Sequence, residues 1–245
     1  MTSSGSGQPS ISTRYVPYAD GDVALTGVLH WDAAAEAQPG ILLVHGGGGL
    51  DEHARDQARR YAELGYAVLA CDMFGQAGAG DREQMMTRIK AFRDDPALLL
   101  RRAQAGLTAM AGCPEVGSGR GAVGFCFGGM TVLALARAGA ELDAVVSMHG
   151  SLATKRPATS GVAMPRVLVC HGSVDPHVPM TDVVALTEEM TEAGADWQVN
   201  VYGKAMHGFT HTHAQPGAVP GVEYNRPADD RSFAAAGAFL AEALG

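Results

Sequence analysis

From residue 41 onward, short apolar runs alternate with amphipathic segments that are long enough to form helices. Parallel strands need long crossover connections, which are usually helices, so this alternation predicts a mostly parallel central sheet with helices on both faces. The expected strands are 41–44, 66–71, 121–124, 144–148, 166–170 and 197–202. The expected helices are 53–64, 85–111 with a possible break at Pro96, 130–138, 181–193 and 230–244.

The N-terminal part shows a different pattern. Residues 11–18 and 23–31 alternate between apolar and polar side chains and are joined by Ala19-Asp20-Gly21-Asp22, which predicts an antiparallel hairpin beside the parallel strands. Residues 1–10 are rich in Ser and Gly, and we expect a disordered tail there. The remaining residues, 11–245, suit a single α/β domain, with no insert long enough to build a separate lid domain.

Composition excludes several classes of function. The formal net charge of -8 argues against nucleic acid and anionic membranes as partners, because both are bound by clustered Lys and Arg. The N-terminus lacks the apolar core of a secretory signal, and no run reaches the ~18 apolar residues of a membrane span. We therefore expect a cytoplasmic protein with reduced thiols and a small-molecule partner, without metal or cofactor. Nothing in the sequence predicts an oligomeric state.

The four cysteines, Cys71, Cys113, Cys126 and Cys170, show no CxxC spacing. Three of them fit the usual fate of a free cysteine, which is a small buried apolar residue. Cys126 differs, because it lies in Gly124-Phe125-Cys126-Phe127-Gly128-Gly129 between an expected strand and an expected helix. A nucleophile elbow needs small residues two positions before and after the nucleophile, since the turn is tight. The helix N-terminus below Cys126 would also favour a thiolate.

An elbow requires an acid and a histidine further along the chain, in that order. Asp175 follows the expected strand 166–170, and His207 follows the strand 197–202. Both therefore lie at carboxyl ends of strands, where open α/β sheets place their sites. We expect His207 to activate Cys126 and then to protonate the leaving group, and Asp175 to orient His207 and stabilise its charged form.

A run of glycines, His45-Gly46-Gly47-Gly48-Gly49, comes directly after the first parallel strand. Glycines at this position expose backbone N–H groups toward a developing oxyanion. The expected donors are the N–H groups of Gly47 and Phe127, with Gly46 and Gly48 as alternatives. We expect a structural role for the His45 side chain.

With these motifs in place, the chain resembles the dienelactone hydrolase family over nearly its whole length. The matching stretches are His45-Gly46 to Leu50, YAVLACDMF from Tyr66, GFCFGG around Cys126, HGSVDPHVP from His171, HGFTH from His207 and GVEYNRPADDRSF from Gly221. The resemblance implies an α/β-hydrolase fold and carries the Cys–Asp–His set onto Cys126, Asp175 and His207.

Three positions depart from the family's pattern. Gly46 occupies the position of a glutamate that switches on the thiol in the dienelactone-cleaving prototypes. Gln76 and His211 occupy the positions of two arginines that bind the substrate carboxylate in those enzymes. The loss of the whole set implies direct activation of Cys126 by His207 and a less anionic substrate than dienelactone.

Phe74, Gln76, His149 and His211 are the expected substrate contacts, because each follows a strand or the His207 loop. His149 could equally be a structural histidine, and Tyr224 lies in a segment that could cover the site. The spacing His207-x3-His211-x-His213 permits a metal site, but no Cys or acidic ligand accompanies it and His207 already has a role.

The leading hypothesis is hydrolysis of a carboxylic ester, lactone or thioester through an acyl-cysteine on Cys126. A second hypothesis uses the same thiol, base and oxyanion donors for a lactonisation, cyclisation or isomerisation of a metabolite without net hydrolysis. A third is a catalytically silent binding protein on the same scaffold, although such proteins usually lose part of the triad. Detection of an acyl adduct by intact mass would separate the third hypothesis from the first two.

Overall fold

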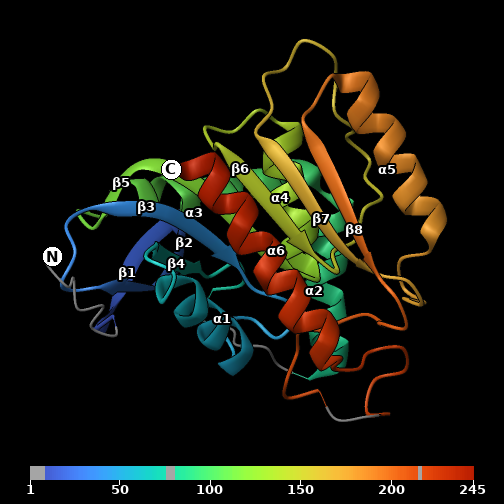
Figure 1. The fold of residues 1–245 in the computed structure, drawn as a ribbon, viewed down its shortest axis with the longest axis horizontal. Helices are drawn as coiled ribbons and strands as arrows, with labels where there is room; N and C mark the ends of the chain where they lie inside the picture. Colours follow the sequence, from blue (N-terminus) through green and yellow to red (C-terminus); the bar gives the residue numbers. More distant parts are fainter. Residues whose placement is uncertain (1–8, 76–80, 215–216) are drawn as a thin grey trace, which may run out of the picture.

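The structure is a computed structural model that describes residues 9–75, 81–214 and 217–245. Eight strands of this part form one mixed sheet in the order β1-β2-β4-β3-β5-β6-β7-β8 (Figure 1). They are β1 (Ile11–Asp20), β2 (Val23–Asp32), β3 (Gln38–Val44), β4 (Ala67–Cys71), β5 (Val116–Phe125), β6 (Ala144–Met148), β7 (Arg166–Gly172) and β8 (Trp197–Tyr202). Strands β1 and β2 pair antiparallel, β2 is antiparallel to β4, and all other pairs are parallel. The predicted α/β-hydrolase fold, with an antiparallel hairpin beside a parallel sheet, is confirmed.

Helices cover both faces of the sheet. They are α1 (Glu52–Ala62), α2 (Arg82–Asp94), α3 (Pro96–Ala111), α4 (Phe127–Arg137), α5 (Met180–Ala193) and α6 (Arg226–Leu244). Figure 1 shows α1 and α6 crossing the near face of the sheet, with α3 and α4 behind it. Buried side chains of α1 and α6 share one apolar core with that face, while those of α2, α3, α4 and α5 share a second core with the other face.

The expected break at Pro96 is present, because Asp95 ends α2 and its carboxylate accepts the N–H groups of Ala97 and Leu98 at the start of α3. The helices begin earlier than expected, by one residue in α1 and α5 and by three in α2, which begins at Arg82 rather than 85. Helix α4 begins at Phe127 rather than 130, directly after the Cys126 turn. Helix α6 begins at Arg226 rather than 230, because the Asn225 side chain caps it.

The predicted disordered tail, residues 1–10, lies almost wholly outside the described residues. Its last member is paired with the hairpin, since the Ser10 carbonyl accepts the N–H of Ala33 and the Ser10 N–H donates to Asp32. The ordered chain therefore begins before residue 11. In the described part of the chain, no helix is both long and apolar enough to cross a membrane.

Candidate active site

The turn between β5 and α4 holds Cys126 in a backbone conformation that side chains rarely adopt, with φ 53° and ψ -111°. The flanking glycines make this turn possible. A Cβ atom on Gly124 would lie 2.0 Å from the Gly128 carbonyl oxygen, and one on Gly128 would lie 2.0 Å from the Val44 carbonyl oxygen. Such strain concentrates at functional sites, where surrounding structure holds it in place.

Three side chains from three strand ends form a continuous hydrogen-bonded chain. The distance from Cys126 Sγ to His207 Nε2 is 3.0 Å, and His207 Nδ1 lies 2.8 Å from Asp175 Oδ2. The second oxygen of Asp175 accepts the N–H groups of His177 and Val178. Asp175 is thus fixed on one side while it orients His207 on the other.

The charges of this chain are set by competing effects. Burial raises the pKa of the Cys126 thiol, but His207 and the N–H groups of Phe127 and Gly47 lower it, so that the pKa lies below its ordinary value. Burial lowers the pKa of His207, but the Cys126 sulfur and Asp175 outweigh this effect and raise the pKa to about 10. The site therefore favours a thiolate beside an imidazolium.

The other three thiols behave differently. Cys71, Cys113 and Cys170 are buried, as expected, and burial raises the pKa of each, to about 12 for Cys71 and Cys170. Cys126 is partly exposed. It is the one cysteine of the chain that combines access with a lowered pKa.

Two backbone N–H groups lower the pKa of the Cys126 thiol, one from Phe127, at the first position of α4, and one from Gly47, after β3. The peptide of Gly46 and Gly47 is held from behind by His45, whose Nδ1 lies 2.6 Å from the Gly46 carbonyl oxygen. His45 Nε2 accepts the N–H of Met73, so Nδ1 carries the proton and donates it to that carbonyl. Because C=O and N–H point in opposite directions across a trans peptide, this bond directs the Gly47 N–H toward Cys126.

Helix α2 lies over the glycine run, which the sequence pattern did not indicate. A Cβ atom on Gly47 would lie 2.7 Å from Met85 Sδ and 3.1 Å from Ile89 Cδ1. Phe74 packs beside this cover, with ring centroids 4.7 Å from His45 and 5.3 Å from Phe127. These contacts place Phe74 next to His45 and Phe127, which flank Cys126. The Arg88 guanidinium lies 5.8 Å from the Phe74 ring centroid.

The other expected substrate contacts have different surroundings. Gln76 lies outside the described residues. His149 is only 2 % exposed, and its ring packs at 5.4 Å against His207, so it supports His207 from within the protein rather than lining an open wall. His211 is half-buried and stacks at 4.5 Å on His53. A side chain at position 46 would point toward Cys126, because a Cβ there would lie 3.7 Å from Cys126 Cβ.

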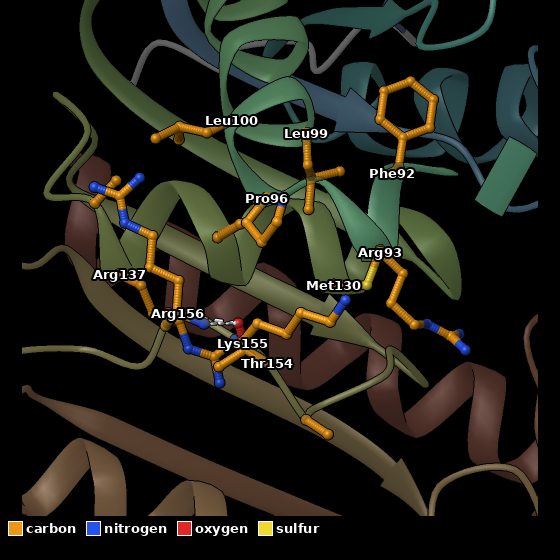
Figure 2. Close-up of a pocket in the computed structure, with 13 residues that line it drawn as sticks. Phe92, Arg93, Pro96, Leu99, Leu100, Met130, Arg137, Thr154, Lys155 and Arg156 are labelled. Atoms are coloured by element: carbon orange, nitrogen blue, oxygen red, sulfur yellow. Dashed lines mark hydrogen bonds between the residues drawn. The ribbon is translucent and has the colours of Figure 1, made fainter. Parts of the chain in front are cut away.

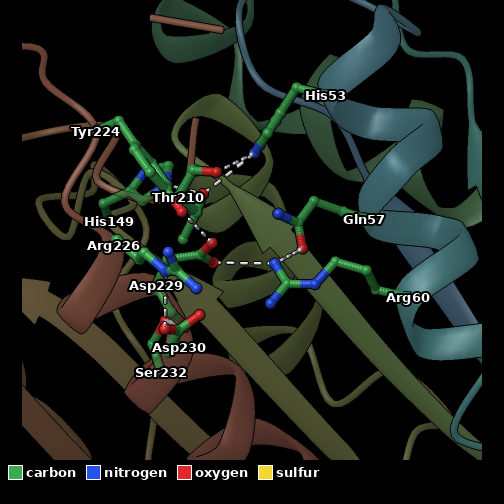
Figure 3. A network of polar contacts seen from close by, with 10 residues as sticks. All are labelled: His53, Gln57, Arg60, His149, Thr210, Tyr224, Arg226, Asp229, Asp230 and Ser232. Carbon is green, nitrogen blue, oxygen red and sulfur yellow. Dashed lines mark hydrogen bonds and ion pairs between the residues drawn. The ribbon is translucent and has the colours of Figure 1, made fainter. Parts of the chain in front are cut away.

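A buried polar chain connects His53 to the ring behind His207 (Figure 3). His53 Nε2 donates to the Thr210 carbonyl, and the Thr210 hydroxyl lies 3.2 Å from the same nitrogen and 2.8 Å from His149 Nε2. A consistent assignment has the hydroxyl accept from His53 and donate to His149, which leaves the His149 proton on Nδ1. Burial and the neighbouring His207 hold the pKa of His149 well below its usual value, so this ring is neutral.

The segment before α6 holds the His207 loop in place. The His207 N–H donates to the Gly221 carbonyl, and the His207 carbonyl accepts the N–H of Glu223. Tyr224, a candidate to cover the site, instead donates its hydroxyl to Asp229, 3.3 Å away. His177, which the sequence did not single out, packs its ring at 5.3 Å against His207 and bonds to the Pro220 carbonyl.

The histidines after His207 do not join it in one cluster. His213 lies near Glu52 and Asp56 on the surface, and this trio could offer ligand atoms to a metal ion. Exposed acidic groups beside a histidine are common without a metal. His207 faces Cys126 instead, so the spacing His207-x3-His211-x-His213 does not describe one metal site.

Comparisons with known proteins agree with this fold. A family model described as the dienelactone hydrolase family matches residues 25–244. The crystal structure of a dienelactone hydrolase-like promiscuous phosphotriesterase, P91, from metagenomic libraries is 39% identical with a TM-score of 0.91, covering 96% of this chain and all of that one. A structure named m3DLH is 37% identical with a TM-score of 0.91, covering 98% of this chain and all of that one. An uncharacterised Caenorhabditis elegans protein, K02A2.1, is 36% identical over 146 residues, which are 58% of this chain and 92% of that protein.

Proposed function

This chain belongs to the dienelactone hydrolase family, and from that premise we propose that it hydrolyses carboxylic esters, lactones or thioesters through an acyl-cysteine on Cys126. The observation that carries the proposal is the surroundings of the Cys126 sulfur. His207 contacts it at 3.0 Å, and two backbone N–H groups, of Phe127 and Gly47, point at the same atom. A nucleophile, a base and oxyanion donors thus converge on one point.

The first half of the reaction forms the acyl-enzyme. The Cys126 thiolate attacks the carbonyl carbon, and the N–H groups of Gly47 and Phe127 stabilise the negative charge that develops on the oxygen. The carbon–oxygen bond to the leaving group then breaks, or the carbon–sulfur bond in a thioester. The imidazolium Nε2 of His207 gives its proton to the leaving group.

The second half releases the acid. His207, now neutral, accepts a proton from water, whose oxygen attacks the thioester carbon while the bond to Cys126 Sγ breaks. This step restores the thiolate and the imidazolium. Asp175 stabilises the charged form of His207 in both halves through its bond to Nδ1.

The decisive test compares wild type with Cys126→Ala on p-nitrophenyl acetate, a γ-lactone and an acyl thioester. We expect turnover to fall at least about 1,000-fold, as for loss of other catalytic nucleophiles. Cys113→Ala is the matched control, because it removes a buried thiol outside the site and should retain activity. Turnover of Cys126→Ala near the wild-type rate would refute the assignment of the nucleophile.

Oxygen-labelled water separates hydrolysis from the same chemistry used for cyclisation or isomerisation. In hydrolysis the attacking water places one labelled oxygen in the acid that is released. A product that forms at the rate of substrate loss but carries no label would favour the non-hydrolytic reaction. The proposed role of Cys126 as the nucleophile would be unchanged by that result.

Less anionic substrates are favoured by the glycine at position 46 and by His211, which stands where the prototypes carry an arginine. One cation, Arg88, lies beside Phe74, with its guanidinium 5.8 Å from the ring centroid. We therefore expect kcat/KM to be higher for a neutral ester than for the corresponding carboxylate-bearing ester. A preference for the carboxylate-bearing ester would contradict this expectation. If that preference were lost in Arg88→Gln, Arg88 would be the residue that binds the carboxylate in place of the prototypes' arginines.

A second candidate activity is phosphotriester hydrolysis. It is favoured by the 39% identity over 96% of this chain to P91, which is described as a promiscuous phosphotriesterase. The same thiolate could attack the phosphorus atom, while the N–H donors stabilise the charge on the phosphoryl oxygen. The test is paraoxon hydrolysis. If wild type does not hydrolyse paraoxon, this activity is excluded. If Cys126→Ala still hydrolyses it, the activity belongs to other residues.

A further inference from the structure

A cavity of about 240 Å³ lies between the end of α2, the start of α3, one side of α4 and residues 153–156 (Figure 2). Cys126, Asp175 and His207 are not among the residues that line it. The cavity is therefore a second place at which a small molecule could bind, separate from the reacting atoms.

One side of the cavity is apolar. Phe92, Leu99 and Met130 are 6%, 4% and 5% exposed, and Pro96 and Ala134 continue the same surface. In Figure 2, Phe92, Pro96 and Leu99 lie on one side of the cavity, and Thr154, Lys155 and Arg156 lie on the other. An apolar ligand body would find contacts on the first side.

The other side is basic, in a chain whose net charge is -8. Arg93, Arg137, Lys155 and Arg156 line the cavity, whereas no acidic residue of the described part of the chain does so. Such a concentration of cations in an acidic protein makes the cavity selective for the sign of a ligand's charge.

Two of these four cations are already neutralised. The Arg137 guanidinium makes two bonds to the Glu189 carboxylate, of 2.7 and 2.9 Å, and the Lys155 ammonium lies 2.9 Å from Asp94. Arg93 and Arg156 have no ion-pair partner among the described residues. Their guanidinium groups are therefore available to a ligand anion.

We propose that this cavity binds a small amphipathic carboxylate, with an aryl or short alkyl body against Phe92, Leu99 and Met130 and its carboxylate on one of the two unpaired guanidinium groups, that of Arg93 or that of Arg156. Guanidinium groups recognise carboxylates through paired hydrogen bonds. The size is suitable, because a cavity of about 150 Å³ already admits benzene, so that this one holds a ring with a short acid chain. The proposal does not depend on the reaction proposed above.

The cavity and the Cys126 site are separated by two aromatic rings. Phe92 lines the cavity, and its ring centroid lies 5.4 Å from that of Phe127, whose N–H contacts the Cys126 sulfur. A carboxylate could also enter the Cys126 site as a product analogue. Binding must therefore be measured with that site blocked.

The probe is 3-phenylpropanoate, titrated calorimetrically into protein whose Cys126 has been alkylated with iodoacetamide. We expect a single site with Kd on the order of 1 mM or below, which is reasonable for a ligand of this size. The neutral isostere 3-phenylpropanamide should bind at least about 10-fold more weakly, because it lacks the charge that the guanidinium groups recognise.

Two variants locate the site. Arg93→Gln/Arg156→Gln should raise Kd about 10-fold, and Ala134→Leu, which places a larger side chain in the cavity, should abolish measurable binding. Arg231→Gln and Ala193→Leu are the matched controls, an exposed arginine and a half-buried helical alanine outside the cavity. Thermal unfolding identifies any variant that has lost its fold.

Several outcomes would overturn the proposal. They are equal affinity for the acid and the amide, unchanged binding in a folded Arg93→Gln/Arg156→Gln or Ala134→Leu variant, and binding only while Cys126 is unmodified. Each of these results would mean that the ligand binds at another site, or that its negative charge does not contribute to binding.

Discussion

At the scale of single residues, the four thiols of this chain differ because their neighbours differ. Burial raises the pKa of Cys71 and Cys170 to about 12, and the nearby Asp72 carboxylate adds to the effect at Cys71. Cys126 is subject to burial too, but an imidazole and two backbone N–H groups face its sulfur and lower its pKa. Proximity to charge and dipoles, rather than exposure alone, therefore sets the pKa of Cys126 apart from those of the other thiols.

Alkylation by iodoacetamide measures this difference. A lowered pKa keeps the thiolate populated to lower pH, so the rate at Cys126 should fall only at a pH below the ordinary thiol value of 9.0. The other three cysteines should remain unmodified at about pH 6.5, because their pKa values are raised. In His207→Gln the pH at which the Cys126 rate falls should move upward. Peptide mass mapping assigns each site, and a wild-type rate that falls in the ordinary thiol range would contradict the thiolate–imidazolium pair.

At the scale of elements, the connection from β5 to α4 is determined by close backbone contacts. The first turn of α4 lies so near the end of β3 that a Cβ on Gly128 would overlap the Val44 carbonyl oxygen. A second pair, Gly129 and Gly150, also approaches closely, with a Cβ on Gly129 placed 2.6 Å from Gly150 Cα. Backbone atoms cannot move aside as a flexible side chain can.

Gly128→Ala should therefore destabilise the protein strongly. We expect a loss of about 3 kcal/mol or more in the free energy of unfolding by urea, because the overlap is with backbone. Gly203→Ala is the control, since nothing lies within 4 Å of a Cβ there, and it should change stability by less than about 1 kcal/mol. Equal stabilities of the two variants would mean that the β5–α4 turn can relax.

At the scale of the whole molecule, ion pairs join segments that are far apart in sequence. Arg60 of α1 contacts Asp229 of α6 at 3.0 Å (Figure 3). The Arg60 guanidinium also lies 4.1 Å from the Phe233 ring centroid. Asp229 is only 4% exposed, and burial raises its pKa even though Arg60 opposes this effect. The pair connects the two helices on one face of the sheet.

Arg60→Met should leave a buried carboxylate without its partner, which costs roughly 2 kcal/mol at neutral pH. The pKa of Asp229 should rise further, so the folded state should bind a proton more readily than the unfolded state. The stability deficit relative to wild type should then shrink as the pH falls from neutral, which urea unfolding at several pH values measures. Arg59→Met, which breaks an exposed pair with Glu63, should cost less than about 1 kcal/mol at any of these pH values. A deficit that grows on acidification would contradict this account.

Much of the fold could be predicted because its signals are local. Strands 144–148 and 197–202 and the helix break at Pro96 follow from apolar runs and breaker residues. Errors occurred at helix starts, at Phe127 and Arg226, where a strained turn and an Asn225 cap extend the helix beyond its periodic part. Boundaries of this kind depend on single capping contacts.

The site divides in the same way. Cys126, Asp175 and His207 could be named together because strand ends meet at one edge of a parallel sheet, and the structure brings their side chains into contact. His149 was expected at a cavity wall, but Thr210 holds it behind His207. The cover of Gly47 by Met85 and Ile89 had no signal in the sequence, because it depends on where α2 packs.

The sequence by itself determined the alternation of strands and helices, the glycine-framed turn at Cys126, and the order of the thiol, the acid and the imidazole along the chain. Periodicity and tight turns are properties of neighbouring residues, so a sequence shows them directly. Only the tertiary structure decided which of the nine histidines faces the thiol, which guanidinium groups remain unpaired, and where a cavity opens beside α4. These features arise from contacts between segments far apart in the sequence, such as His207 with Cys126, which are 81 residues apart. Such contacts are set by how whole elements pack, and local sequence patterns carry no record of them.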